Sequence, residues 1–230
     1  MENRLRDGRP QESALGVDHT GFIRANTEIL SPPLIPEIRL HLAHEALPIW
    51  QKTEEELATL GLPPPFWAFA WAGGQALSRF VLDHPETIRG RQVIDLASGS
   101  GLVAIAAMKA GAASVLAADI DVFALCAIGL NAMLNKVTVT ATAEDLLAES
   151  PPACDTILVG DLFYEKALAE RALAWLRKAQ ARGSDILIGD PGRSYLPKNA
   201  LEPIADYHVP ITRELEDSEI KHSRVWRLAA

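Results

Sequence analysis

The twelve residues VIDLASGSGLVA (residues 93–104) decide how the rest of this sequence is interpreted. Their first part is a short apolar run typical of a buried strand, and their last part begins an apolar helix. Gly99 and Gly101 lie between the two and let the backbone approach a ligand closely. The first turn of the following helix offers free N–H groups at the same place. This stretch therefore predicts a strand–loop–helix unit that binds a nucleotide-like cofactor.

Short apolar strands alternate with helices along the rest of the chain. The strands are expected at residues 93–97, 114–118, 137–141, 156–159 and 186–189, and the helices at residues 102–110, 122–135 and 167–182. Such alternation predicts a parallel sheet with helices on both faces. Two later strands, residues 207–212 and 224–228, are expected to pair antiparallel at one edge. The predicted fold is an α/β, Rossmann-like, doubly wound sheet of seven strands.

The N-terminal part lacks this alternation. Residues 1–60 are predicted to form a polar tail and a helical extension, and residues 61–230 the α/β domain. Apolar spacing predicts a helix over residues 37–47, and a capping box predicts another over residues 53–60. The acidic run at residues 214–219 is expected to be a solvated segment.

Composition narrows the classes of function. The chain has 230 residues, of which 48% are apolar and 23% charged, as in soluble globular proteins, and its net charge of −8 argues against nonspecific binding to nucleic acid or anionic membranes. With two cysteines and no Cys/His cluster, no metal site is expected. Residues 1–14 lack the apolar stretch of a signal peptide, and no apolar run approaches the ~20 residues that span a bilayer. A cytoplasmic location is expected.

The acids near the glycine loop favour S-adenosylmethionine over NAD, although residues 99–104 also match the GxGxxA dinucleotide pattern. Asp95 ends the first strand, where a carboxylate suits the cationic amino group of a methionine moiety better than a pyrophosphate. Asp119 ends the second strand, where it could accept both ribose hydroxyls, a role that NAD shares. Ser98 and Ile120 belong to the same predicted site.

Two further acids have competing interpretations. Asp121 is better explained as the N-cap of the next helix than as a ligand of the cofactor. Asp145, after the third strand, is either a solvated residue or lies where it, or its neighbouring backbone, holds the adenine amino group.

The segment GDLFYEK (residues 160–166) follows the fourth strand, at the rim where open α/β sheets bring ligands and reacting partners. It places a carboxylate, Asp161, and a phenol, Tyr164, at that rim. The alternative is structural, with Asp161 capping the following helix and Tyr164 packing beneath it.

Taken together, the DxxxGxG loop, the AxDxD turn and the DxxY segment resemble the seven-strand S-adenosylmethionine-dependent methyltransferases that act on protein lysine. Residues 63–85 and 189–197 are similar to the electron transfer flavoprotein beta-subunit lysine methyltransferases and their bacterial relatives. This resemblance extends over roughly residues 30–228. It implies S-adenosylmethionine as cofactor, S-adenosylhomocysteine as product, and a lysine of that beta subunit as acceptor.

The resemblance also implies roles for individual residues. Trp71, Gly73 and Gln75 would border the cofactor. Asp161 would orient and capture the amine, and the methylated amine would rest against Tyr164 or Phe163 through cation–π attraction. The other aromatic side chains of the run, Trp67 and Phe69, are better explained as packing residues.

Other functions remain open at this point. A ribosomal protein or a small pyridine such as nicotinamide could be the methyl acceptor instead. The chain could also be a scaffold that binds the cofactor without turnover, although the acids Asp95, Asp119 and Asp161 argue against this. An NAD-dependent oxidoreductase is a further alternative, but the sequence offers no convincing base for hydride transfer.

Overall fold

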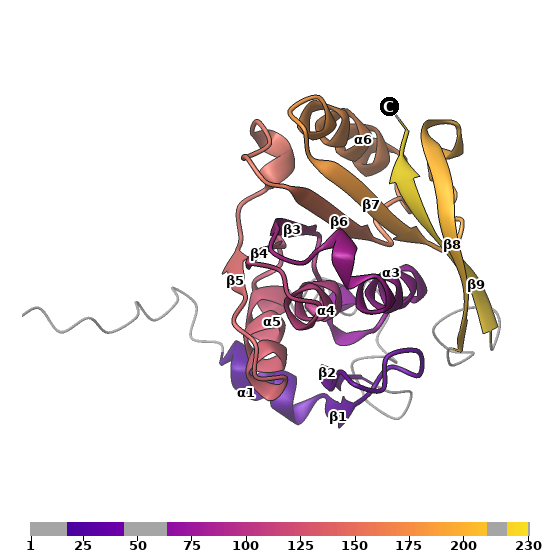
Figure 1. Cartoon of the computed structure of the whole chain (residues 1–230). Coiled ribbons are helices and arrows are strands. Elements are labelled where there is room, and N and C mark those ends of the chain that lie inside the picture. The colour runs from indigo at the N-terminus through magenta and orange to yellow at the C-terminus, as the bar shows by residue number, and fades with distance from the viewer. Residues whose placement is uncertain (1–17, 44–63, 211–219, 230) are drawn as a thin grey trace, which may run out of the picture.

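The structure, a computed structural model, describes residues 18–43, 64–210 and 220–229. A sheet in the order β5-β4-β3-β6-β7-β9-β8 forms its centre (Figure 1). The strands are β3 (Gln92–Leu96), β4 (Ser114–Ala118), β5 (Thr140–Thr142), β6 (Thr156–Gly160), β7 (Asp185–Asp190), β8 (Leu201–Pro210) and β9 (Ile220–Leu228). The first five are parallel, and β9 runs antiparallel to both β7 and β8. The predicted seven-stranded α/β fold is confirmed.

Helices cover both faces of this sheet (Figure 1). They are α3 (Ala72–Asp83), α4 (Leu102–Lys109), α5 (Val122–Leu134) and α6 (Lys166–Gln180). Strand β6 shows why two apolar layers form, because successive side chains of a strand point to opposite faces. Leu158 packs in the layer that contains α3 and α4, whereas Ile157 and Val159 pack in the layer that contains α6. None of the helices that the structure describes is both long and apolar enough to cross a membrane.

The N-terminal part differs from the prediction. It contains α1 (His19–Ala25) and a two-stranded antiparallel sheet of β1 (Glu28–Leu30) and β2 (Leu40–Leu42). The predicted helix over residues 37–47 is wrong in its described part, because residues 40–42 are a strand. Side-chain amides of α5 bind this backbone, with Asn131 Oδ1 accepting from His41 N at 2.7 Å. Its apolar residues, Leu40 and Leu42, pack on α4 in the same core cluster.

Several predictions lie outside the described residues. These are the polar tail up to residue 17, the helix over residues 53–60, the boundary between residues 60 and 61, and the acidic run at residues 214–219.

Helix α3 is not predicted by the sequence, in which the alternating aromatic residues Trp67, Phe69 and Trp71 before Gly73-Gly74 have the spacing of an extended segment. A short 3₁₀ helix, η1 (Phe66–Ala68), comes first, and both glycines then lie in the first turn of α3. The glycines serve a close approach between helix and strand. A Cβ atom on Gly73 would lie 2.3 Å from the carbonyl oxygen of Gly189 in β7, so only glycine fits there.

Candidate active site

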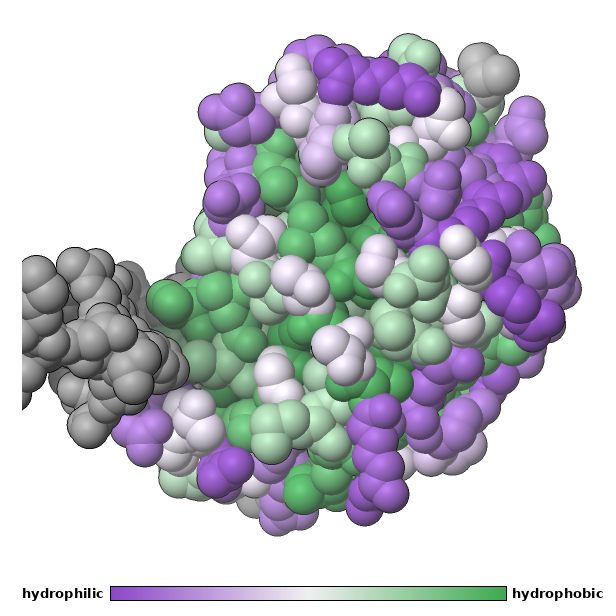
Figure 2. All heavy atoms as spheres, turned by 60° about the vertical axis from the view of Figure 1, so that its left-hand side comes forward, coloured by the Kyte–Doolittle hydropathy of each residue, from purple (hydrophilic) through white to green (hydrophobic). Residues whose placement is uncertain are grey.

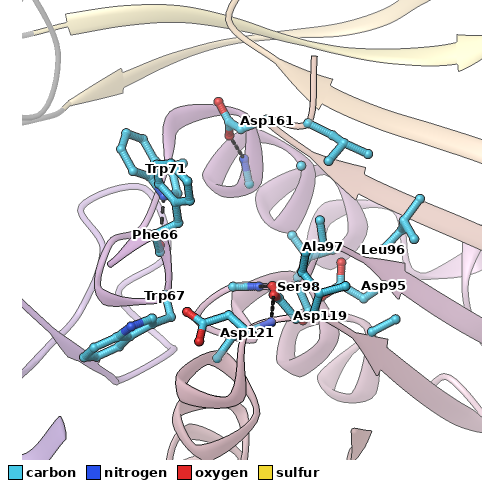
Figure 3. A pocket seen from close by; sticks show the side chains of 18 of the residues that line it. Phe66, Trp67, Trp71, Asp95, Leu96, Ala97, Ser98, Asp119, Asp121 and Asp161 are labelled. Carbon is cyan, nitrogen blue, oxygen red and sulfur yellow. Dashed lines mark hydrogen bonds between the residues drawn. The ribbon is translucent and has the colours of Figure 1, made fainter. Parts of the chain in front are cut away.

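A cavity of about 500 Å³ opens at the carboxyl ends of β3, β4 and β6, where ligands of open α/β sheets bind. Its volume lies in the range usual for small-molecule sites. The space-filling view shows a hollow with mainly apolar walls between hydrophilic margins (Figure 2). Asp95 and Asp119 lie on one side of the cavity and the aromatic side chains of Phe66, Trp67 and Trp71 on the other, with Asp161 at the top between them (Figure 3).

Unusual backbone conformations occur at two of the strand ends. Ala97 follows β3 and Asp161 follows β6, and each has a φ of 54°. A positive φ costs a non-glycine residue about 1–2 kcal/mol. Such strain tends to persist where function requires it. Here it turns the chain sharply out of the sheet, so that both residues line the cavity.

Asp95 fastens the glycine loop to α4. Its Oδ2 accepts hydrogen bonds from Ser98 Oγ and from Ala104 N in the first turn of that helix. The side chain lies at the cavity wall but is only 1% exposed. Burial raises the pKa of Asp95 to about 7, although its two hydrogen bonds favour the ionised form. A cation bound beside Asp95 would stabilise its carboxylate.

Asp119 holds the loop from the neighbouring strand. Its Oδ2 accepts from Gly99 N at 2.8 Å and its Oδ1 from Asp121 N at 3.0 Å. Each oxygen keeps a second lone pair, so the carboxylate could also accept hydroxyl groups. Burial raises the pKa of Asp119, and Ile120 beside it is exposed at the cavity edge.

The remaining acids of this wall combine structural contacts with positions at the cavity. Asp121 is the N-cap of α5, as predicted, and its Oδ1 accepts from Phe123 N. Asp145 caps the 3₁₀ helix η3 (Leu146–Ala148), and its Oδ2 accepts from Arg171 Nη2 at 2.8 Å. Both acids line the cavity.

Aromatic rings form the opposite wall. Trp71 Nε1 donates to Phe66 O at 3.0 Å, and the Phe66 ring lies 6.0 Å from Trp71 and 5.7 Å from Tyr164. The phenol of Tyr164 is half exposed, and burial together with Glu165 raises its pKa. Trp67 is buried and stacks on Phe123 of α5 at 5.9 Å, which agrees with its predicted packing role, and it also lines the cavity.

Asp161 is held from two sides. Its Oδ2 accepts from Gly74 N at 2.8 Å, and its Oδ1 accepts from Arg193 Nη2 at 2.9 Å and Nε at 3.3 Å. The Gly74 N–H belongs to the first turn of α3, where helix dipoles favour negative charge. Asp161 is therefore an anchored carboxylate whose charge is compensated by a helix end and a guanidinium.

Arg193 lines the cavity. It belongs to residues 190–195, for which the sequence leaves two interpretations equally open, a place at the substrate entrance or an ordinary turn. Its guanidinium carbon lies 5.7 Å from the centre of a Trp71 ring. The loop that carries it is fixed by Asp190 Oδ1, which accepts from Gly192 N at 2.6 Å and Arg193 N at 2.7 Å. An aspartate followed by glycine and arginine at these spacings is a turn signal, but the pattern does not say where the arginine points.

Some of the predicted site residues lie behind the cavity wall. Gly73 packs on β7, and Gly101, with a φ of 79°, begins α4 against Ile128. Gln75 is buried, and its side chain donates to Ala70 O and accepts from Leu34 N. Phe163 is 0% exposed in the layer with α6, which leaves Tyr164 as the ring of this segment that faces the cavity.

The remaining predicted residues border the cavity together. They are Trp71, Asp95, Ser98, Gly99, Asp119, Ile120, Asp145, Asp161 and Tyr164. Phe66 and Arg171 also border it and were not predicted, and Arg193 borders it from the segment 190–195, which the sequence places either at the substrate entrance or in an ordinary turn. The available signal for Phe66 was that an aromatic residue lies five positions before the predicted Trp71, whereas the sequence offered no signal for Arg171.

Comparison with known proteins agrees with this geometry. The family model "Ribosomal protein L11 methyltransferase (PrmA)" matches residues 75–160. The electron transfer flavoprotein beta subunit lysine methyltransferase of Xenopus laevis is 41% identical over 211 residues, covering 89% of this chain and 85% of the relative. The protein of the same name from Danio rerio is 37% identical over 217 residues, covering 91% of this chain and 83% of the relative.

Solved structures show the same fold. Magnesium protoporphyrin IX methyltransferase from Synechocystis PCC 6803, determined with bound SAM, has a TM-score of 0.50 and 19% sequence identity. The match covers 69% of this chain and 80% of that one. Given the identity and the coverage of its relatives, the chain belongs to the family of electron transfer flavoprotein beta subunit lysine methyltransferases.

Proposed function

We propose that this protein transfers methyl groups from S-adenosylmethionine to a lysine side chain of the electron transfer flavoprotein beta subunit. One observation carries the proposal: a single cavity connects Asp95 and Asp119, which hold the glycine loop, with Asp161 and Tyr164 after β6. The relatives that match most of the chain bear the name of this activity, which supports the choice of acceptor.

The residues of the cavity fit S-adenosylmethionine. Asp95 would hold the amino group, because a buried acid with a pKa of about 7 gains from a nearby cation. Asp119 would accept the ribose hydroxyls, and Asp145 or its neighbouring backbone would hold the adenine amino group, with Trp71 bordering the cofactor. When bound, the cofactor supplies an electrophilic methyl group on a positively charged sulfur and is released as S-adenosylhomocysteine.

The rim of the cavity fits a lysine amine. An unperturbed lysine has a pKa of ~10.4, and its amine must lose a proton before it can attack a methyl group. Desolvation between the rings of Phe66, Trp71 and Tyr164 would favour the neutral amine. Asp161 is fixed on both sides and can therefore orient that amine, and placement of this kind supplies much of the acceleration of a displacement reaction. A methylated ammonium could rest on the same rings.

A ribosomal protein is the second candidate acceptor, because the family model carries that name. Its match ends at Gly160, directly before Asp161, so the match covers the cofactor-binding part of the domain and not the rim segment. The relatives named for the flavoprotein subunit match both parts, which favours that acceptor. A cytoplasmic location remains a prediction from the sequence.

The test is a methylation assay with the purified beta subunit, S-adenosylmethionine labelled in its methyl group, and mass spectrometry to locate the methylated residue. We expect methyl-lysine with the wild-type protein and a loss of at least about 100-fold with Asp161→Asn, since misplacement alone can cost that much. The amide oxygen of the substituted side chain could still accept a hydrogen bond from Gly74 N, so the variant removes charge with little loss of packing.

Tyr195→Ala is the matched control, because Tyr195 is a tyrosine of the neighbouring loop that is 45% exposed and not part of the cavity wall. It should methylate the subunit at the wild-type rate. Methylation of ribosomal protein L11 in place of the beta subunit would select the second candidate. If Asp161→Asn incorporated labelled methyl groups as fast as the wild type, the proposed role of Asp161 at the rim would be refuted.

A further inference from the structure

The ion pair of Arg193 and Asp161 lies where it can influence the protonation of the acceptor amine. An isolated carboxylate at this position would favour the ammonium form of a lysine, which cannot be methylated. The structure does not leave the carboxylate isolated. The guanidinium of Arg193 donates to Asp161 Oδ1 through two nitrogen atoms, at 2.9 Å and 3.3 Å, and lines the same cavity.

Contacts with Asp190, Asp161 and Trp71 help to fix the position of Arg193. Asp190 Oδ1 holds its backbone N–H, Asp161 holds its side chain, and the ring of Trp71 lies 5.7 Å from its guanidinium carbon. An arginine remains charged at every pH relevant to an enzyme. A permanent positive charge is therefore fixed at the rim where the acceptor amine would enter.

We infer that Arg193 keeps the acceptor lysine in its neutral, nucleophilic form, by compensating the charge of Asp161 and disfavouring a second cation beside it. This inference rests on the proposed function and assigns one further residue to it. Asp161 then orients the amine without raising its pKa, and the proton of the amine leaves to solvent before the methyl group is transferred. Arg193 acts through charge and is a positioning residue.

Other titratable groups face the same place and must be told apart from the amine. Asp190 is buried at the end of β7, and burial and the charge of Asp161 raise its pKa to about 6. Tyr164, on the rim after β6, has a raised pKa because of burial and the charges of Glu165 and Asp119. From α3, the Gly74 N–H faces Asp161 and does not titrate. An effect on the amine is therefore expected between the ranges in which Asp190 and Tyr164 titrate.

The experiment measures kcat for methylation of the purified beta subunit from pH 6 to pH 10, since kcat reports groups in the enzyme–substrate complex. Arg193→Met removes the charge but keeps a long side chain beside Trp71. In this variant we expect the rising part of the plot of kcat against pH to move to higher pH by about one unit. The kcat would then be about tenfold lower at neutral pH and restored at high pH. KM should stay the same or fall, because the ammonium form binds better to an uncompensated Asp161.

Two further variants make the result specific. Arg193→Lys keeps a positive charge, so its kcat should rise over nearly the same pH range as that of the wild type. Asp190→Asn can still accept from Gly192 N and Arg193 N through its oxygen, so the rising part of its plot above pH 7 should not move.

Three results would contradict the inference or the substrate assignment on which it rests. A rising part of the plot for Arg193→Met that coincides with that of the wild type would overturn the inference and leave the proposed function standing. An even loss of kcat at all pH values with a raised KM would also overturn it, because that pattern indicates a structural role. No methylation of the beta subunit by the wild-type protein at any pH would remove the substrate assignment, and the inference with it.

Discussion

The contact between α3 and β7 makes the structure directly testable through Gly73→Ala. The added methyl carbon would lie 2.3 Å from Gly189 O and 2.6 Å from Asp161 Oδ2. A backbone oxygen cannot rotate away, so the helix must move off the strand. Overpacking of this kind costs about 1–3 kcal/mol, and we expect the upper end, about 3 kcal/mol. For a chain of this size, that corresponds to a fall in Tm of roughly 6–12 °C.

Thermal unfolding followed by circular dichroism measures this effect. Gly74→Ala is the matched control, one residue further along the same helix, because its methyl carbon would meet only Val103 Cγ2 at 3.8 Å. Alanine also favours a helix over glycine by up to about 1 kcal/mol, so the Tm of Gly74→Ala should stay the same or rise. A Tm of Gly73→Ala within a degree of the wild type, or an equal fall in both variants, would refute the reasoning.

Two more predictions concern the cofactor site and α5. Asp95 has a pKa of about 7 and is therefore partly protonated at pH 6.5. The cationic amino group of S-adenosylmethionine would favour its carboxylate form. Binding of the cofactor should therefore release protons, and the affinity should rise as the pH rises towards 8. Calorimetry at pH 6.5 in buffers of different ionisation enthalpy should show that release for the wild type and not for Asp95→Asn, and equal heats in both buffers would contradict it. Gly129 lies within α5, and a Cβ atom there would meet nothing within 4 Å, so Gly129→Ala should stabilise the protein by about 0.5–1 kcal/mol. A Tm that rises by roughly 1–4 °C would agree with this prediction. A fall in Tm would contradict it, because it would mean that the added methyl group meets other atoms of the protein.

Local patterns explain why much of the sheet was predictable. Residues 114–118 were expected as a strand and form β4 with the same bounds. The third strand was expected at residues 137–141 and is found at residues 140–142, where it pairs with β4 over only three residues. A short edge strand has few partners, so its position depends on the neighbouring strand more than on its own residues.

Glycine and aromatic residues were harder to interpret. The aromatic residues before Gly73-Gly74 have the spacing of an extended segment, but in the structure the glycines lie in the first turn of α3, where Gly73 lets the helix touch β7. The spacing of apolar residues 37–47 fitted a helix, yet side chains of α5 and α4 bind residues 40–42 as a strand. Tertiary contacts outweigh local preference in both places.

Residue spacing predicts the alternating strands and helices and the strand–loop–helix unit around Asp95. Within that unit the structure adds local contacts, from Ser98 three residues away and from Ala104 nine residues away. Contacts of this kind depend on local geometry, which residue spacing reveals. Packing of distant segments brings Gly74, 87 residues before Asp161, and Arg193, 32 residues after it, to the same carboxylate. Such contacts depend on how helices and loops pack against the finished sheet, and no local pattern records them.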